Sequence, residues 1–190
     1  MKKLLVTIIA IALVGLFSAC SGTDNVAEDT HDHSGHTHDV EYSESVQASA
    51  ALAPTQGNNV QGNVTFQQEA DGRVRIIAEV SGLTPGFHGF HVHENGDCSA
   101  PDASSAGGHF NPHHTEHGKA GEGVYHAGDL PSLNADADGN AKLDVLLDGI
   151  DITGDHGIVG RSLIVHADPD DYISQPTGNS GARVACAVIQ

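Results

Sequence analysis

Histidines dominate the residues of this sequence that could bind a metal. The chain has 14 of them among 190 residues, and the neutral imidazole ring is a preferred ligand of zinc and copper. His91 and His93 lie two positions apart in a strand-like segment, so their side chains share one face, about 6.6 Å apart along the strand. Such a pair is common and alone predicts nothing specific.

Further donors follow in a long polar segment and after a later apolar one. One set would combine three imidazoles and a carboxylate, which suits structural zinc: His109, His117, His126 and Asp129. A second set would combine four imidazoles, which suit Cu(II): His91, His93, His109 and His166. His109 would serve both sets, because an imidazolate ring has two nitrogen donors. The alternative is that these are scattered surface histidines, and spacing alone leaves both interpretations open.

The elements that must position these residues are short strands. Glycine is abundant (23 residues) and no long amphipathic helical pattern occurs. Strands are predicted at residues 46–53, 60–68, 73–80, 89–94, 141–147, 162–166 and 183–189. The pattern favours an all-β fold, an eight-stranded antiparallel Greek-key sandwich or barrel. Two long functional loops, 95–133 and 167–182, would interrupt it, and metal ligands would explain their length.

The first 19 residues have the pattern of an export signal. Two lysines precede an apolar run over residues 4–17, and Ser18 and Ala19 lead to Cys20 in a sequence that resembles a bacterial lipobox. Cys20 would then be acylated and would anchor the protein to a membrane, which we expect to be the outer membrane, with the protein periplasmic or extracytoplasmic. The alternative is an ordinary cleaved signal followed by an incidental cysteine.

Residues 20–44 are polar and acidic, which predicts a disordered tether ahead of one domain at 45–190. The tether contains four histidines interleaved with aspartates: His31, His33, His36 and His38. This segment could gather metal for the domain, or it could be a merely polar linker.

The number of cysteines and the net charge further restrict the class of protein and its partners. Without Cys20, the pair Cys98 and Cys186 remains, which in an exported chain predicts a disulfide, with two free thiols as the alternative. The net charge of −17 argues against nucleic acid or an anionic membrane surface as a partner. Whether the protein is a monomer or a homodimer is left open.

The segments that carry these residues resemble the signature segments of the copper–zinc superoxide dismutases, in particular the bacterial exported type. They are GFHGFHVHENGDC (86–98), GGHFNPHHTEHG (107–118), YHAGDLPSL (125–133), GDHGIVGRSLIVHADPDD (154–171) and GNSGARVACAVI (178–189). The resemblance runs from about residue 46 to 189 in the order of the family. It implies an enzyme with one copper and one zinc per subunit. Such an enzyme converts superoxide to oxygen and hydrogen peroxide by alternating Cu(II) and Cu(I), while zinc is structural.

The resemblance also assigns roles to single residues. It makes the four-imidazole set the copper ligands and the other set the zinc ligands, with His109 bridging the metals and carrying a proton. Asp170 would link a copper-ligand histidine to a zinc-ligand histidine, and its alternative role is that of a solvated loop acid. Arg183 would guide the anionic substrate, unless it is simply a surface arginine at the start of the last strand. Cys98 and Cys186 match the disulfide of the family.

Several alternatives stay open. His113 and His114 could compete with His117 for zinc, while His88 and His156 match family positions that are structural. At the level of function, the alternative is an extracytoplasmic copper- and zinc-binding or metal-buffering protein without turnover.

Overall fold

A computed structural model describes residues 45–190 of the chain. The predicted signal segment, the lipidation of Cys20 and the predicted tether lie outside the described residues. Within 45–190, no helix is long and apolar enough to cross a membrane.

Nine strands form one antiparallel sheet in the described part of the chain. They are β1 (Gln47–Pro54), β2 (Gln61–Gln68), β3 (Val74–Ser81), β4 (Gly86–His88), β5 (Phe90–His93), β6 (Leu133–Ala135), β7 (Ala141–Leu147), β8 (Ser162–His166) and β9 (Arg183–Val188). Their order in the sheet is β4-β6-β7-β3-β2-β1-β9-β8-β5. One 3-10 turn, η1, covers Ser104–Ala106. The predicted all-β antiparallel class is confirmed.

Over residues 45–190 the structure has nine strands, one more than the predicted eight and two more than the seven ranges located in the sequence, because β4 and β6 were not found. The segment predicted to begin a strand at residue 89 is preceded by the separate strand β4, and β4 pairs with β6 whereas β5 pairs with β8. Both β4 and β6 have only three residues. Elements that short show too little alternation to be recognised in the sequence.

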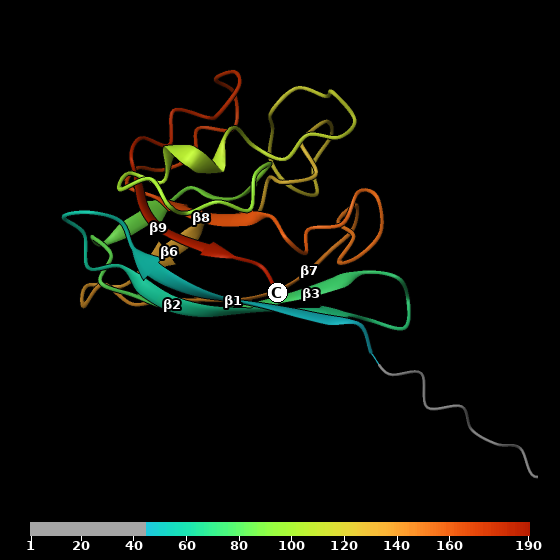
Figure 1. The fold of residues 1–190 in the computed structure, drawn as a ribbon, viewed down its shortest axis with the longest axis horizontal. Coiled ribbons are helices and arrows are strands. Elements are labelled where there is room, and N and C mark those ends of the chain that lie inside the picture. The colour runs from blue at the N-terminus through green and yellow to red at the C-terminus, as the bar shows by residue number, and fades with distance from the viewer. Residues whose placement is uncertain (1–44) are drawn as a thin grey trace, which may run out of the picture. The chain divides into compact units, whose positions relative to one another are not determined.

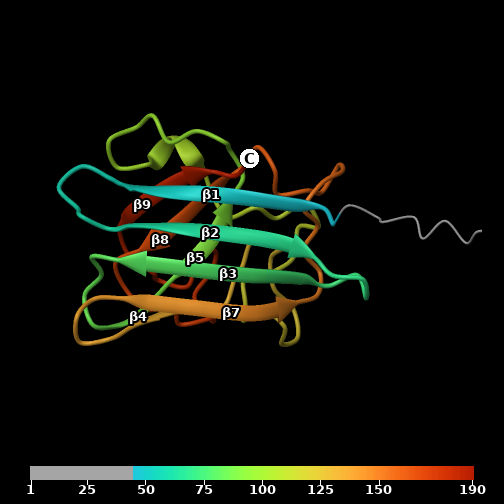
Figure 2. The ribbon, with the colours of Figure 1, turned by 90° about the horizontal axis from the view of Figure 1, so that it is seen from below.

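Strand β1 connects the two halves of the sheet. Its residues 47–52 pair with β2, and its last residues, Ala53 and Pro54, pair with β9. The sheet therefore turns back on itself, with β1, β2, β3 and β7 side by side in Figure 2 and with β8 and β9 in the facing layer in Figure 1. The main hydrophobic core lies between these layers.

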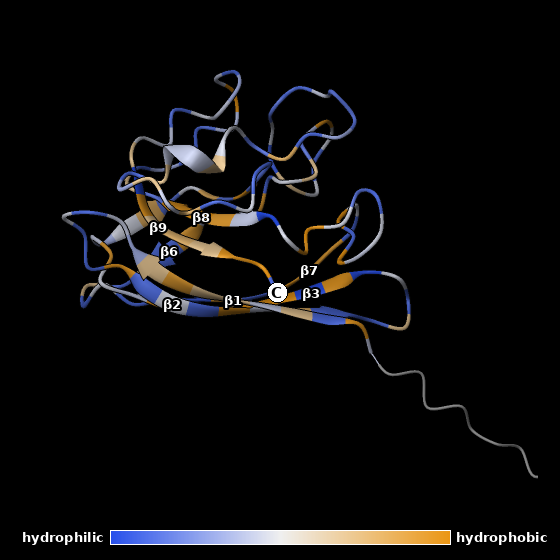
Figure 3. Ribbon diagram, in the orientation of Figure 1, coloured by the Kyte–Doolittle hydropathy of each residue, from blue (hydrophilic) through white to orange (hydrophobic). Residues whose placement is uncertain are grey.

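The burial pattern explains where the histidines lie. Buried and exposed residues alternate along the first half of β1 and along most of β3, as expected for strands with one face on the core. Strands β5 and β8 are instead buried at every position. Phe90 and Val92 of β5 belong to the core, so the alternation of side chains turns His91 and His93 to the opposite face. That face is covered by the long loops, which Figure 3 shows as largely hydrophilic.

The disulfide between Cys98 and Cys186 is present and ties the long loop to β9. It lies beside a small apolar cluster that includes Ala103, Ala106 and Ile164. The bond closes a chain segment with a sequence separation of 88 residues. A crosslink over this length removes much conformational freedom from the unfolded chain.

We expect replacement of both cysteines by serine to lower the free energy of unfolding by about 4.6 kcal/mol, from the loop-entropy relation. Urea unfolding of the metal-free variant and of the metal-free parent measures this difference. The parent with its disulfide reduced is the control, and it should unfold like the variant. An unfolding midpoint equal to that of the oxidised parent would contradict the prediction.

Candidate metal centre

The candidate centre is built on the outer face of β5, where two loop segments lie against the strand. Isolated antiparallel bridges join His91 to Asp129 and His93 to His109. The strand thus brings two histidines of its own next to a histidine and a carboxylate from residues 109–129. These segments are joined by backbone pairing, which the sequence did not indicate.

One glycine makes this docking close. The Val92 N–H donates to the Gly128 carbonyl oxygen, and the Phe110 N–H donates to the Val92 carbonyl oxygen, each at 2.8 Å. A Cβ atom at Gly128 would lie 2.3 Å from the Val92 carbonyl oxygen. Only glycine lets the loop approach β5 this closely, so Gly128 helps to fix the position of the neighbouring Asp129.

The first group of candidate ligands collects around one carboxylate oxygen. Its members are buried, and their ligand atoms lie within 4.8 Å of one another: His109, His117, His126 and Asp129. The Nδ1 atoms of the three histidines lie 2.9, 3.0 and 3.4 Å from Oδ1 of Asp129. A tetrahedron with zinc-to-ligand bonds of about 2.0–2.1 Å has edges of about 3.3 Å. The group therefore matches the size and donor set of a tetrahedral zinc site.

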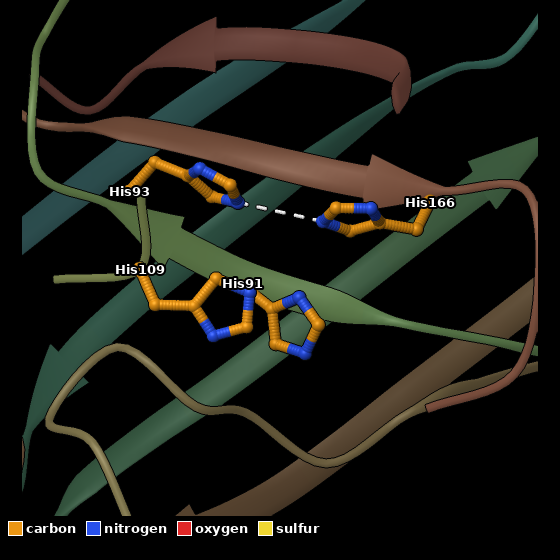
Figure 4. A group of neighbouring side chains, drawn as sticks. All are labelled: His91, His93, His109 and His166. Atoms are coloured by element: carbon orange, nitrogen blue, oxygen red, sulfur yellow. Dashed lines mark hydrogen bonds between the residues drawn. The ribbon is translucent and has the colours of Figure 1, made fainter. Parts of the chain in front are cut away.

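The second group is shown in Figure 4. Its ligand atoms also lie within 4.8 Å of one another, and it consists of His91, His93, His109 and His166. The Nε2 atoms of His93 and His166 face each other at 3.4 Å. Their Nδ1 atoms lie 2.9 Å from the Gly107 carbonyl oxygen and 3.2 Å from the Gly181 carbonyl oxygen. Because a carbonyl only accepts, the hydrogen of each neutral ring belongs on Nδ1, which leaves two Nε2 lone pairs directed at one point.

Unpaired atoms at the same place support metal binding. Among residues 45–190, three buried side-chain atoms have no hydrogen-bond partner, namely Nδ1 of His91, Nε2 of His109 and Nδ1 of His126. A buried polar atom without a partner is costly and rare. Each of the three rings is a member of one or both groups, so two bound metal ions would satisfy all three atoms. The residues present fit both metals.

Asp170 connects the two groups. Its Oδ2 lies 2.7 Å from Nε2 of His91, and its Oδ1 lies 2.9 Å from Nε2 of His117. Its side chain is buried, and the Tyr172 N–H also donates to Oδ1. The carboxylate thus lies between one histidine of the second group and one of the first. It turns Nδ1 of one histidine of each group toward the respective ligand set.

Two contributors were not found from the sequence. A Cβ at Gly178, whose φ is +64°, would lie 1.9 Å from Oδ1 of Asp170 and 2.6 Å from Nε2 of His117, so a glycine is needed where the loop covers that pair. The Gly107 carbonyl oxygen accepts from Nδ1 of His93 and from Nη2 of Arg183. The type of a residue does not indicate what its backbone carbonyl will bind. The only signal in the sequence for these two contributions was the high glycine content of the loops.

Arg183 is partly buried at the start of β9. Its Nη1 and Nη2 donate to the carbonyl oxygens of Ala103 and Gly107, each at 2.6 Å. Burial lowers the pKa of His93 and His166, and the nearby charge of Arg183 lowers both further. The guanidinium group is therefore held close to the second group, because it shares the Gly107 carbonyl oxygen with His93.

The other four histidines among residues 45–190 lie outside both groups. His88 is buried, with Nδ1 and Nε2 each 2.8 Å from a backbone carbonyl oxygen, which agrees with a structural position. His113 and His114 are exposed, so the structure brings only His117 of these three into the first group. His156, predicted to be structural, is also exposed, and its ring centroid lies 4.8 Å from that of His113.

The electrostatic environment differs among the ligand candidates. Burial lowers the pKa of His166 to about 3. Burial also lowers the pKa of His109 to about 4, although the hydrogen bond to Asp129 opposes this shift. For His117, burial acts downward as well, but hydrogen bonds to Asp129 and Asp170 outweigh it and raise the pKa to about 9. At neutral pH, His109 and His166 are therefore neutral and able to bind metal.

These shifts predict that the metal-free domain is most stable near pH 6.5. Below that pH, His109 and His166 become protonated in the unfolded chain, where histidine has a pKa of 6.5, but stay neutral in the folded domain. Each of the two residues then lowers the free energy of unfolding by about 1.4 kcal/mol per pH unit, until its folded pKa is reached. Above pH 6.5, the stabilisation contributed by protonated His117 is lost as the pH rises toward 9.

Urea unfolding in the presence of a chelator, at pH 4.5, 6.5 and 8.5, tests this prediction. The same series with His117 replaced by glutamine is the control, and it should lose the decline on the alkaline side. A stability that rises steadily from acid to alkaline pH would contradict the assignment.

Comparisons with known proteins agree with this geometry. The family model described as "Copper/zinc superoxide dismutase (SODC)" matches residues 60–189, and the chain belongs to this family. A similar solved structure is titled "Crystal Structure Analysis of the clock protein EA4". It is 42% identical, covers 75% of this chain and 92% of its own, and has a TM-score of 0.69. The family binds copper and zinc, and the two groups on β5 and its loops could hold both ions.

Proposed function

We propose that this protein is a superoxide dismutase, which converts superoxide to oxygen and hydrogen peroxide. The observation that carries the proposal is the position of His109, whose ring belongs to both ligand groups. Its Nδ1 lies beside Asp129, while its buried Nε2 has no partner among the described residues. Copper would be held by the second group and zinc by the first. Copper, when bound, supplies the one-electron oxidation and reduction of superoxide.

The chain itself contributes a proton carrier. Nδ1 of His109 is held on the side of the first group, so Nε2, when it is not serving as a metal ligand, is the atom of this ring that can take up a proton from water. It can deliver that proton to the reduced substrate, and the second proton of hydrogen peroxide comes from water. His109 is buried, with 6% of its surface exposed, and this burial restricts the orientation of the ring. Such a positioned acid contributes about 100-fold or more to a proton-transfer step.

The chain also provides a local positive charge that can attract the substrate, although its net charge of −17 repels an anion at long range. Arg183 is a fixed positive charge close to the second group, and a local charge in a low-dielectric wall can oppose a distant repulsion. Asp170 keeps one histidine of each group in place, so that the ligand sets remain assembled during turnover.

The test is the rate at which purified protein with both metals consumes superoxide. The matched control is the same protein loaded with zinc alone, which keeps the fold but lacks the redox-active ion. We expect rapid consumption only in the copper-containing form. Protein that binds one copper and one zinc per chain yet consumes superoxide no faster than the control would instead be a metal-binding or metal-buffering protein.

We further propose that the domain is exported and anchored by a lipid on Cys20. The support is the sequence pattern of residues 1–20 alone. Fractionation of cells that express the full chain should recover it with membranes, and Cys20→Ser should move it to the soluble fraction of the same compartment. Recovery of the parent in the soluble fraction would argue for an ordinary cleaved signal.

A further inference from the structure

We propose that His113 and His156 form a third metal site, on the surface, that binds a divalent transition-metal ion and prefers Cu(II). Their ring centroids are 4.8 Å apart and their planes meet at 83°. Pairs within the two buried groups have similar geometry, for example 4.9 Å for His91 and His166 and 5.0 Å for His93 and His109. Two imidazoles at this separation can bind one ion between them, with water completing its coordination.

Both histidines lie in turns that are held in place. His113 lies in the turn that the His114 N–H closes onto the Asn111 carbonyl oxygen, and Oδ1 of Asn111 accepts from the Thr115 N–H at 3.0 Å. His156 lies in the turn closed by the Gly157 N–H and the Gly154 carbonyl oxygen at 3.0 Å. Each ring is therefore carried by a defined backbone, and a pre-positioned pair loses less entropy on binding an ion.

The two turns are also fixed relative to each other. The guanidinium group of Arg161 lies over the ring of Phe110, 3.5 Å from its centroid. Nε of the same arginine donates to the carbonyl oxygen of Gly157 at 2.9 Å. Phe110 is three residues before His113, and Gly157 follows His156, so one side chain connects the two segments that carry the histidines.

The pair has no other role that the structure shows. Both residues are exposed, and within the part of the chain described here neither ring takes part in a hydrogen bond. An edge-to-face contact between aromatic rings is the simpler explanation of the geometry. It makes no provision for an ion, however, so metal titration separates the two explanations.

The chemistry sets the order of affinity. Imidazole ligands bind Cu(II) more tightly than Zn(II) or Ni(II). Only two protein donors are present, and they are in contact with solvent, so the ion should exchange readily. The surface site would therefore fill after the buried groups, and its occupant would connect residues 110–125 with residues 148–161.

The experiment is a Cu(II) titration of the full chain after both buried sites have been filled. Because histidines at 31, 33, 36 and 38 could bind copper too, all four are replaced by asparagine in every protein compared. Calorimetry counts the added equivalents, and electron paramagnetic resonance reports nitrogen coordination. We expect one additional Cu(II) per chain with two nitrogen ligands.

Single replacements identify the site. His113→Asn and His156→Asn should each weaken the additional equivalent by about 10-fold or more, because the second imidazole no longer acts as an intramolecular ligand. His114→Asn is the matched control, since this exposed neighbour of His113 makes no ring contact with His156, and it should leave the equivalent unchanged. Circular dichroism of each variant shows whether the fold is kept.

Three results would overturn the proposal. They are the absence of an additional Cu(II) equivalent in the parent, its persistence in His156→Asn, and its equal loss in His114→Asn. The first would leave an aromatic contact only, and the others would place the ion elsewhere on the surface.

Discussion

His109→Ala is expected to lower the rate of superoxide consumption by about 100-fold or more, because it removes the proton carrier of the proposed reaction. The same change takes Nε2 from the second ligand group and Nδ1 from the first. No other residue of the two groups belongs to both. We therefore expect weaker binding of both metals, together with the loss of rate. Superoxide decay after a radiation pulse gives the rate, and elemental analysis gives the metal content.

The matched control is His114→Ala, which makes the same chemical change at an exposed position of the same loop. It should leave rate and metal content unaltered. His117→Ala separates the two contributions, because it removes a member of the first group only. If His109→Ala kept both ions and most of its rate, a shared imidazole could not be the basis of the proposed chemistry.

The framework of the fold was largely predictable because β5, β7, β8 and β9 have clear apolar runs or alternation. The exact bounds predicted for β7 and β8 are those observed, 141–147 and 162–166. Strands β4 and β6 were missed because a three-residue strand is defined by its partner and not by its own pattern. The segment GFHGFHVH (86–93) gave no sign that it would pair with two different neighbouring strands.

The candidate site was predictable for a different reason. Metal ligands must be histidines, cysteines or acids, so the residue types themselves restrict the choice, and the structure brings every member of both predicted sets together. What spacing could not show is the contribution of the backbone. The Gly107 carbonyl oxygen fixes both His93 and Arg183, and the absence of a side chain at Gly178 makes room for Asp170.

The contact between His113 and His156 is another feature that the sequence did not predict. His113 was weighed only as a competitor of His117, its close neighbour in sequence. The residue it meets is 43 positions further along the chain. The two loops are brought together by Arg161 and Phe110, a pairing that neither loop reveals alone.

Arg183→Glu is expected to slow superoxide consumption by about 10-fold to 100-fold at low ionic strength, because it replaces a focusing positive charge by a repelling one. Metal content should not change, since Arg183 contributes no ligand atom to either group. The Gly107 carbonyl oxygen loses one donor but keeps Nδ1 of His93. The dependence of the rate on salt distinguishes an electrostatic effect of the substitution from a structural one, because screening should slow the parent and accelerate the variant. The measurement is the rate constant at several salt concentrations.

Two further variants make the result specific to position and charge. Arg75→Glu changes the net charge by the same amount, but Arg75 is on β3, in an exposed ion pair with Asp144 at 2.7 Å, and its loss should alter the rate little. Arg183→Lys keeps the charge without the paired donors to Ala103 and Gly107, so its rate should lie between those of the parent and Arg183→Glu. Because the whole molecule is strongly acidic, equal effects of Arg75→Glu and Arg183→Glu would mean that overall charge controls the rate. A larger effect at Arg183 alone would mean that a single local charge overcomes the repulsion of the rest.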